Sequence, residues 1–158
     1  MSLAPRRRRI RAALVALFLL ALALSTRGMK PTNVARTSEG SADALLRPLL
    51  LAFDEREAAA LVRSLVPRMR TYGRAWRLIS ESKQGEEMRF AIEVPVLVFT
   101  DDLSLTLRPH PSGTLVEVHS RSRVGRGDFG ENARHIRQIM SALKAEVDAG
   151  KSSGEPRN

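Results

Sequence analysis

Two segments of alternating residues joined by a short turn constrain the fold of this chain more than any other feature. Leu103–Arg108 has a leucine at every second position, and Thr114–Val124 alternates valines and serines with bulkier, mostly polar residues. A period of two is the pattern of a strand with one buried and one solvated face. Because His110-Pro111-Ser112-Gly113 is typical of a turn, the two segments are predicted to form an antiparallel hairpin.

Further strand patterns precede this hairpin. Arg74–Ser82 and Met88–Thr100 read as two more strands, and Pro95 is predicted to cause a break or bulge within the second. Leu49–Phe53 is a short apolar run that follows Pro48. The sequence therefore predicts an antiparallel sheet of about four to five strands.

Two amphipathic helices are predicted, one before and one after the four later strands in the sequence. Asp54 followed by Glu57 has the spacing of a capping box, and Pro67 should end or kink the helix that follows. The second helix is predicted from about Asp128 to Ala149, with Gly150 as its terminator. The apolar stripes comprise Ala58, Leu61, Val62, Leu65 and Met69, and Ile136, Ile139, Met140, Leu143 and Val147. Strands and helices in this order indicate an α+β fold, with both helices packed on one face of the sheet.

The first thirty residues have a different character. Five arginines between Arg6 and Arg11 precede the unbroken apolar run Ala12–Leu24, which is the arrangement of an export signal or membrane anchor. An N-terminal hydrophobic helix is therefore expected. The run is shorter than the ~20 residues of a typical spanning helix, so a retained anchor, which is slightly favoured, and a cleaved signal both fit. The positive-inside rule leaves the N-terminus in the cytoplasm and the rest of the chain outside it.

These patterns divide the chain into four parts. A basic and apolar segment covers residues 1–27, and a flexible linker rich in Ser, Thr, Gly and Ala covers 28–44. A globular α+β domain is predicted over 45–150 and a disordered tail over 151–158.

Charge and composition exclude several classes of function. The net charge is +9, but residues 1–30 contribute +7, and the remaining chain carries 19 basic and 17 acidic side chains. A nearly neutral body is a poor match for a nucleic-acid-binding protein, and one Trp and one Tyr offer no platform for stacking single strands. The absence of Cys excludes disulfides, thiolate catalysis, zinc–thiolate sites and a lipid-modified cysteine.

Residues 120–136 carry the one distinctive motif. It consists of Ser120, Ser122, Arg123 and Gly125, then Asp128, Gly130 and Asn132, then Arg134 and Ile136. This pattern resembles the signature of the bacterial and plastid family catalogued as domain of unknown function 1499, and Phe99-Thr100-Asp101-Asp102 resembles that family's aromatic-x-Asp-Asp hairpin. Asn33-Val34 stands where the family has Asn-Cys-Val, without the cysteine. The resemblance covers roughly residues 42–148, and it implies an exported or membrane-tethered protein with no established molecular activity.

The motif has a structural and a functional interpretation. In the first, Asp128 caps the last helix, Gly125 and Gly130 allow the turn, and Arg123 or Arg134 clamps strand to helix through the Asp128 carboxylate. In the second, arginines converge beside a helix N-terminus and hold a phosphate or carboxylate. The candidate ligand-binding residues are Arg121, Arg123, Arg126, Arg134 and His119, and the candidate structural residues are Ser120, Ser122, Gly125, Asp128, Gly130 and Asn132. The structural interpretation is favoured, because the capping spacing accounts for Asp128 without a ligand.

No familiar catalytic motif is present. The sequence lacks a nucleophile elbow, a zinc-protease helix, a phosphate loop and a dinucleotide fingerprint. His119 shares a predicted strand face with Glu117 and Arg121 and could act as a general base, although a plain surface histidine is the commoner case. Asp101-Asp102 has no apparent third ligand for a metal and reads as a pair of turn residues, so no metal and no cofactor are expected.

Two functions remain open at this stage. The first is a non-enzymatic, membrane-tethered domain outside the cytoplasm, which binds a small anionic or lipidic ligand or an envelope protein, or serves as a structural module of the envelope. The second is a hydrolase or transferase that acts on an anionic or lipid-like substrate and combines His119 with the arginine cluster as an anion clamp. Convergence of His119, Arg121 and Arg123 in a deep cleft would favour the enzyme, and a flat charged face would favour binding.

Overall fold

The structure, a computed structural model, describes residues 32–124, 127 and 129–153. The described residues belong to one unit, and the predicted apolar segment, Ala12–Leu24, lies outside them. The strands are β1 (Val34–Arg36), β2 (Leu49–Leu51), β3 (Arg70–Thr71), β4 (Arg74–Ala75), β5 (Arg77–Gln84), β6 (Glu87–Val96), β7 (Phe99–His110) and β8 (Gly113–Ser122). The helices are η1 (Ala44–Leu46), α2 (Glu55–Leu65), η2 (Val66–Arg68) and α3 (Glu131–Ser153). None of the helices within the described ranges is long and apolar enough to span a membrane.

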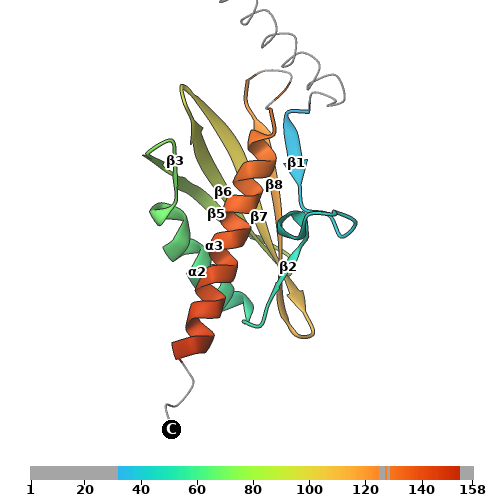
Figure 1. The fold of residues 1–158 in the computed structure, drawn as a ribbon. Coiled ribbons are helices and arrows are strands. Elements are labelled where there is room, and N and C mark those ends of the chain that lie inside the picture. Colours follow the sequence, from blue (N-terminus) through green and yellow to red (C-terminus); the bar gives the residue numbers. More distant parts are fainter. Residues whose placement is uncertain (1–31, 125–126, 128, 154–158) are drawn as a thin grey trace, which may run out of the picture. The chain divides into compact units, whose positions relative to one another are not determined.

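Six strands form one antiparallel sheet (Figure 1). β5, β6, β7 and β8 are neighbours in chain order, and both β1 and β2 pair with the outer edge of β8. The β7–β8 hairpin turns between His110 and Gly113, as the alternating sequence predicts. β3 and β4 form a separate two-stranded ribbon. The predicted α+β class with an antiparallel sheet is confirmed.

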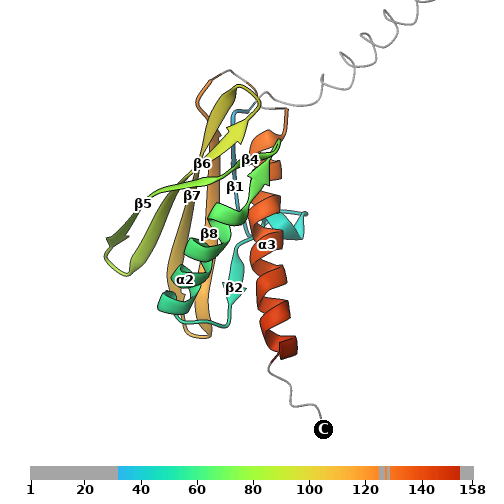
Figure 2. The same ribbon diagram turned by 90° about the vertical axis from the view of Figure 1, so that its left-hand side faces the viewer.

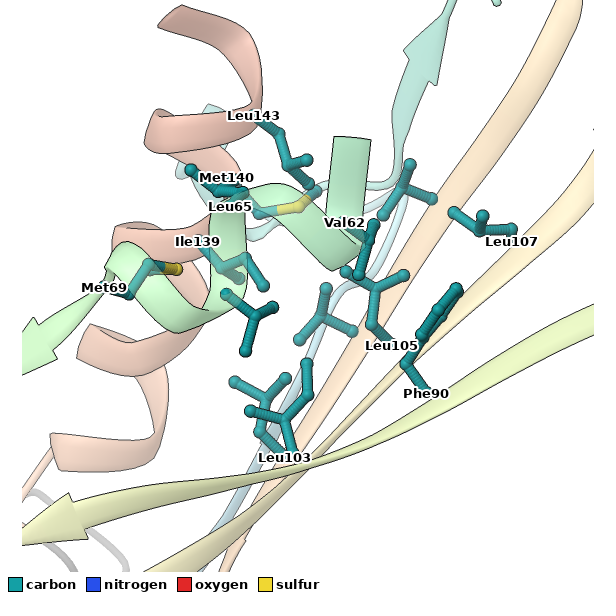
Figure 3. Packing of buried hydrophobic residues seen from close by; sticks show 14 of the residues in the cluster. Val62, Leu65, Met69, Phe90, Leu103, Leu105, Leu107, Ile139, Met140 and Leu143 are labelled. Carbon is teal, nitrogen blue, oxygen red and sulfur yellow. The ribbon is translucent and has the colours of Figure 1, made fainter. Parts of the chain in front are cut away.

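Both α-helices lie on the same side of this sheet, as the two views in Figures 1 and 2 show. The inward residues of β6, β7 and β8 meet the apolar stripes of α2 and α3 in one hydrophobic core (Figure 3). Val62 and Leu65 from α2, Leu105 from β7 and Ile139 from α3 are among its members. None of the helices in the described residues lies over the opposite face of the sheet.

The start and end of α2 are set by the residues that the sequence indicates. Asp54 Oδ1 accepts a hydrogen bond from the Glu57 backbone N–H (2.8 Å), and Glu57 Oε2 accepts one from the Asp54 backbone N–H (3.3 Å). This reciprocal pair is the predicted capping box. The α-helix ends at Leu65, and the turn around Pro67 is a 3-10 helix, as expected from the missing N–H of proline.

Two strand boundaries differ from the prediction. Arg74–Ser82 is not one strand, because the buried Trp76 separates β4 from β5. Pro95 does not break β6, whose register with β7 is regular through Val96. The pairing of β6 with β5 has already ended at Glu93, so the missing N–H of Pro95 removes no ladder bond on that side.

The structure has a strand within the predicted linker. β1 pairs residue by residue with the end of β8, from Val34 opposite Arg121 to Arg36 opposite His119. The Asn33 carbonyl also accepts a hydrogen bond from the Ser122 N–H (2.9 Å). A three-residue strand of this kind depends on its partner, which lies more than eighty positions away, and its own sequence gives no alternation to detect.

The bounds of α3 also differ from the prediction. The helix begins at Glu131, because Phe129 and Gly130 have φ values of 50° and 86°, outside the helical range. The N-cap position therefore falls on Gly130, and the predicted cap, Asp128, lies outside the described residues. At the other end α3 continues past Gly150 into the predicted tail, since one glycine within a helix costs only ~1 kcal/mol relative to alanine.

Candidate functional site

Asn132, in the first turn of α3, connects three parts of the chain. Its side chain is fully buried. Its Oδ1 accepts a hydrogen bond from Ser120 Oγ (2.6 Å), and its Nδ2 donates to Ser122 Oγ and to the Asn33 carbonyl (2.9 Å each). One amide thus joins α3 to β8 and to the residue that precedes β1. These contacts within the fold account for three of the six candidate structural residues without any ligand.

One turn further along α3, the imidazole of His135 is fully buried between two carboxylates. Its Nδ1 lies 3.7 Å from Asp101 Oδ2, and its Nε2 lies 3.5 Å from Glu131 Oε2. The ring of Trp76 meets the imidazole edge to face, with 6.1 Å between centroids. Burying an ionisable group costs free energy unless it has a polar partner. In this cluster each nitrogen of the His135 imidazole has a carboxylate oxygen nearby.

This cluster is not among the sites predicted from the sequence. The sequence pattern predicts Asp101 and Asp102 as turn residues, whereas both lie within β7, with Asp101 buried and Asp102 partly exposed. The helical periodicity of α3 does indicate that His135 and Asn132 are buried. Asn132 and His135 lie four positions before Ile136 and Ile139, on the buried stripe, where a polar residue needs a specific partner.

Glu131 connects the buried cluster to the surface. Tyr72 Oη donates a hydrogen bond to Glu131 Oε1 (3.0 Å), Arg134 pairs with the same carboxylate, and the Arg134 guanidinium lies 5.0 Å from the centroid of the Tyr72 ring. Burial alone would raise the pKa of Glu131, but the hydrogen bonds from Arg134 and Tyr72 outweigh it, and the pKa is lowered. Arg134 is therefore engaged on the helix-covered side of the sheet.

Among the described residues, Arg123 binds carboxylates of the sheet; Asp128, its partner in the predicted clamp, lies outside the described residues. The Arg123 guanidinium binds Asp102 Oδ1 (2.6 Å) and Glu93 Oε1 (2.7 Å), on the neighbouring strands β7 and β6. These hydrogen bonds, first to Asp102 and then to Glu93, raise the pKa of Arg123 further above its usual range. The reason for these contacts is the alternation of β8, since the odd-numbered residues from Glu117 to Arg123 point away from the helices.

The predicted convergence of the motif arginines is thus only partial. Arg121 lies beside Arg123, 3.8 Å from Asp102, and His119 lies on the same uncovered face. Arg134 is on the other side of the sheet. Arg126, Gly125 and Asp128 lie outside the described residues.

The uncovered face of the sheet is hollowed on both sides of His119. One hollow, of about 290 Å³, lies between His119 and β5 and is lined by Ile79, Arg121 and Arg123 among others. The other, of about 380 Å³, extends from His119 towards β1 and is lined by Arg36, Thr37, Ser38, Ser104, Thr106, Arg108, Glu117 and Val118. Both are open depressions rather than a deep cleft. We refer to the second as the β1 hollow.

The β1 hollow has the chemistry of a small polar site. It contains two guanidinium groups, an imidazole and several hydroxyl-bearing side chains, against one carboxylate, Glu117, which pairs with Arg108. This lining suits an anion better than a cation. Within the described ranges, no three His, Asp or Glu side chains gather in a way that could hold a metal ion.

Comparison with known proteins identifies a family and nothing more specific. No curated protein and no solved structure matches the chain. The model of a protein family of unknown function, DUF1499, matches residues 23–143, which include the Asn33–Asn132 contact, the buried His135 cluster and the whole sheet. The chain therefore belongs to the DUF1499 family.

Proposed function

We propose that this protein is a membrane-tethered module outside the cytoplasm that binds a soluble, small anionic ligand in the β1 hollow without transforming it. The tether is the basic and apolar segment of residues 1–27, whose apolar run ends at Leu24. The observation that carries the binding role is the charge balance of the uncovered sheet face. Among the described residues, its arginines outnumber its carboxylates by six to four. The arginines are Arg36, Arg77, Arg89, Arg108, Arg121 and Arg123, and the carboxylates are Glu87, Glu93, Asp102 and Glu117.

The pairing on this face leaves one arginine available for a ligand. Arg108 binds both Glu87 (2.8 Å) and Glu117 (3.0 Å), and Arg123 binds two carboxylates in the same way. Arg36 has no carboxylate partner among the described residues. An anion in the β1 hollow would meet Arg36 together with the hydroxyl groups of Ser104 and Thr106. A carboxylate or phosphate offers acceptors that match a guanidinium in two-point geometry.

One observation favours the alternative, a hydrolase or transferase. Ser104 lies directly opposite His119 in the β7–β8 register, on the uncovered face, so a hydroxyl nucleophile and a general base are on neighbouring strands. A serine nucleophile needs its base within hydrogen-bond reach. No hydrogen bond joins these two side chains in the part of the chain that the structure describes, and the hollow is open to water. Binding is therefore the better-supported function.

Titration with inorganic phosphate, followed by the NMR resonances of the His119 imidazole, tests the binding role. We expect the His119 resonances to move with phosphate at constant ionic strength, and to lose this response in Arg36→Ala. Arg89→Ala is the matched control, because Arg89 lies on the same face but pairs with Glu87 outside the hollow. Equal responses in Arg36→Ala and the unaltered protein would refute the site. Turnover of a phosphate ester that disappears in His119→Ala would instead support the enzyme.

The tether is tested separately. A reporter enzyme that is active only after export, fused at Asn158, is expected to be active, and the chain is expected to stay with membranes through an alkaline wash. A stably made but inactive fusion would contradict the location. Release of a shortened chain that starts near Leu24 or Thr26 would show that the segment is a cleaved signal.

A further inference from the structure

Four connections meet at one end of the described domain. The strand registers align them: Val96 lies opposite Phe99, Asp101 opposite Ser122, and Val34 opposite Arg121. The β6–β7 turn, the β8–α3 connection and the start of β1 are therefore at the same end, and both ribbon views show the β3–β4 turn close to them (Figures 1 and 2).

Large apolar side chains are exposed at this end. Val98 is 84% and Phe129 88% exposed, and Leu97, Phe99, Val124 and Tyr72 are each more than half exposed. We call these six residues the apolar end. The β5–β6 and β7–β8 turns at the opposite end contain Gly85, Glu86, Pro111 and Ser112, and no large hydrophobic residue is exposed in either turn. Apolar groups gathered on one part of a surface usually mark a place of contact.

Backbone conformation singles out the same residues. Tyr72, Leu97 and Phe129 have φ values of 50°, 48° and 50°, and they are the non-glycine residues with positive φ among those described. Glycine or asparagine is the usual occupant of such a position. In each of three separate turns a bulky apolar residue stands there instead, and each is at the apolar end. Strained backbone of this kind tends to persist where it serves a function.

The length of the chain between the predicted anchor and the domain limits how far this end can be from a membrane. Eight peptide steps join Leu24 to Thr32, and they span at most ~28 Å when fully extended. β7 has 12 residues and is roughly 37 Å long. A chain anchored at Leu24 can therefore hold the β1 end close to the bilayer, and it is too short to let the opposite end take that position with the strands upright.

We propose that the apolar end lies in the interface of a lipid bilayer, with Val98 and Phe129 below the head groups and Tyr72 at their level. This inference rests on the proposed tether and adds a second membrane contact to it. Tyrosine suits the interface, because its ring is apolar and its hydroxyl group can stay hydrated. Arg74 and Arg123 are exposed near this end, where guanidinium groups can reach lipid phosphates.

The chain contains no cysteine, so a single labelled cysteine can report on each end. Full-length Val98→Cys and Ser112→Cys proteins, each carrying an environment-sensitive fluorophore, would be reconstituted in vesicles of phosphatidylcholine with a minor fraction of phosphatidylglycerol. Residue 112 is the matched control, since it is an exposed turn position at the opposite end. The fluorescence of Trp76, a buried core residue, shows whether each variant is folded.

We expect the label at residue 98 to shift to the blue, to be quenched by spin-labelled lipid and to be protected from iodide. The label at residue 112 should show the reverse. Leu97→Gly removes one apolar side chain from this end, and glycine suits the positive φ of that position. In this variant we expect the protein to stay folded and the residue 98 label to be quenched less by spin-labelled lipid.

Equal iodide quenching of the two labels would overturn the inference. This is also the result expected if the apolar end binds a protein, since no such protein is present in the vesicles. Retention of the chain through an alkaline wash, measured on the same vesicles, separates the two proposals. A retained chain with a water-exposed residue 98 leaves the tether standing and refutes the membrane contact. A chain that is washed off refutes the tether, and an unshifted residue 98 label in that sample still refutes the contact.

Discussion

The substitution Asn132→Ala tests whether the buried amide holds α3 onto the sheet. It removes three hydrogen bonds, one from Ser120, one to Ser122 and one to the Asn33 carbonyl. A hydrogen bond contributes a net ~1 kcal/mol, and a buried polar group left without a partner costs ~1–3 kcal/mol. Because the Ser120 side chain is fully buried, we expect the free energy of unfolding to fall by about 3–4 kcal/mol.

Urea unfolding of the chain that begins at Thr32 measures this loss. Trp76 is the one tryptophan, and it is 2% exposed, so its fluorescence reports the core directly. With a slope of ~1–3 kcal/mol per molar urea, the midpoint should drop by about 1–4 M without a change in slope. Far-ultraviolet circular dichroism should give the same midpoint if unfolding is two-state.

Ser122→Ala is the matched control, since it removes one of the same three bonds and should cost ~1 kcal/mol. Ser120→Ala combined with Asn132→Ala should cost less than the sum of the two single changes, because both remove one shared bond. If Asn132→Ala unfolds at the midpoint of the unaltered protein, the amide does not hold α3 to β8 and this account of the motif is wrong.

Three other changes test separate features by the same urea assay. A Cβ at Gly113 would lie 2.0 Å from a β2 carbonyl oxygen, so Gly113→Ala should destabilise clearly more than Gly85→Ala, which has open space and should cost ~1–2 kcal/mol from its positive φ alone; equal losses would contradict this contact. The pKa of Glu131 is lowered on folding from its ordinary 4.5, so its contribution to the free energy of unfolding is complete above pH 4.5 and is lost as the pH falls through the folded pKa. In Glu131→Gln, the urea midpoint should therefore decline less steeply with falling pH. An equally steep decline in the variant and the unaltered protein would contradict this. Arg123→Ala should leave the midpoint nearly unchanged, since its ion pairs are exposed, whereas a large drop would support the predicted strand-to-helix clamp.

The parts of the fold that the sequence predicts correctly are specified locally. α2 begins at a capping box whose two members are three residues apart, and it ends before Pro67. The β7–β8 hairpin has alternation on both sides of a short turn. In each case the interacting groups lie within one continuous stretch of chain, so the pattern is visible without knowledge of a distant partner.

The parts that the sequence does not predict depend on distant partners. β1 exists because the edge of β8 accepts it, and Pro95 is tolerated because β5 has already ended. The partners of Arg123 follow from the register of three strands, which places Glu93 and Asp102 beside it. His135 is placed by the buried stripe of α3, but its neighbour Asp101 can be assigned only once β7 is known to pass beneath it.

The membrane contact and the anion site, taken together, restrict the nature of the ligand. His119 pairs with Ser104, five residues along β7 from Phe99, so the β1 hollow lies about 17 Å from the apolar end along the strand. The interfacial region of a bilayer adds only about 5–8 Å to each side of the hydrocarbon core. With the apolar end in that interface and the strands upright, the hollow stands in water, beyond the lipid phosphates. The anion that reaches Arg36 is then a soluble one, and inorganic phosphate should displace it while anionic vesicles should not compete.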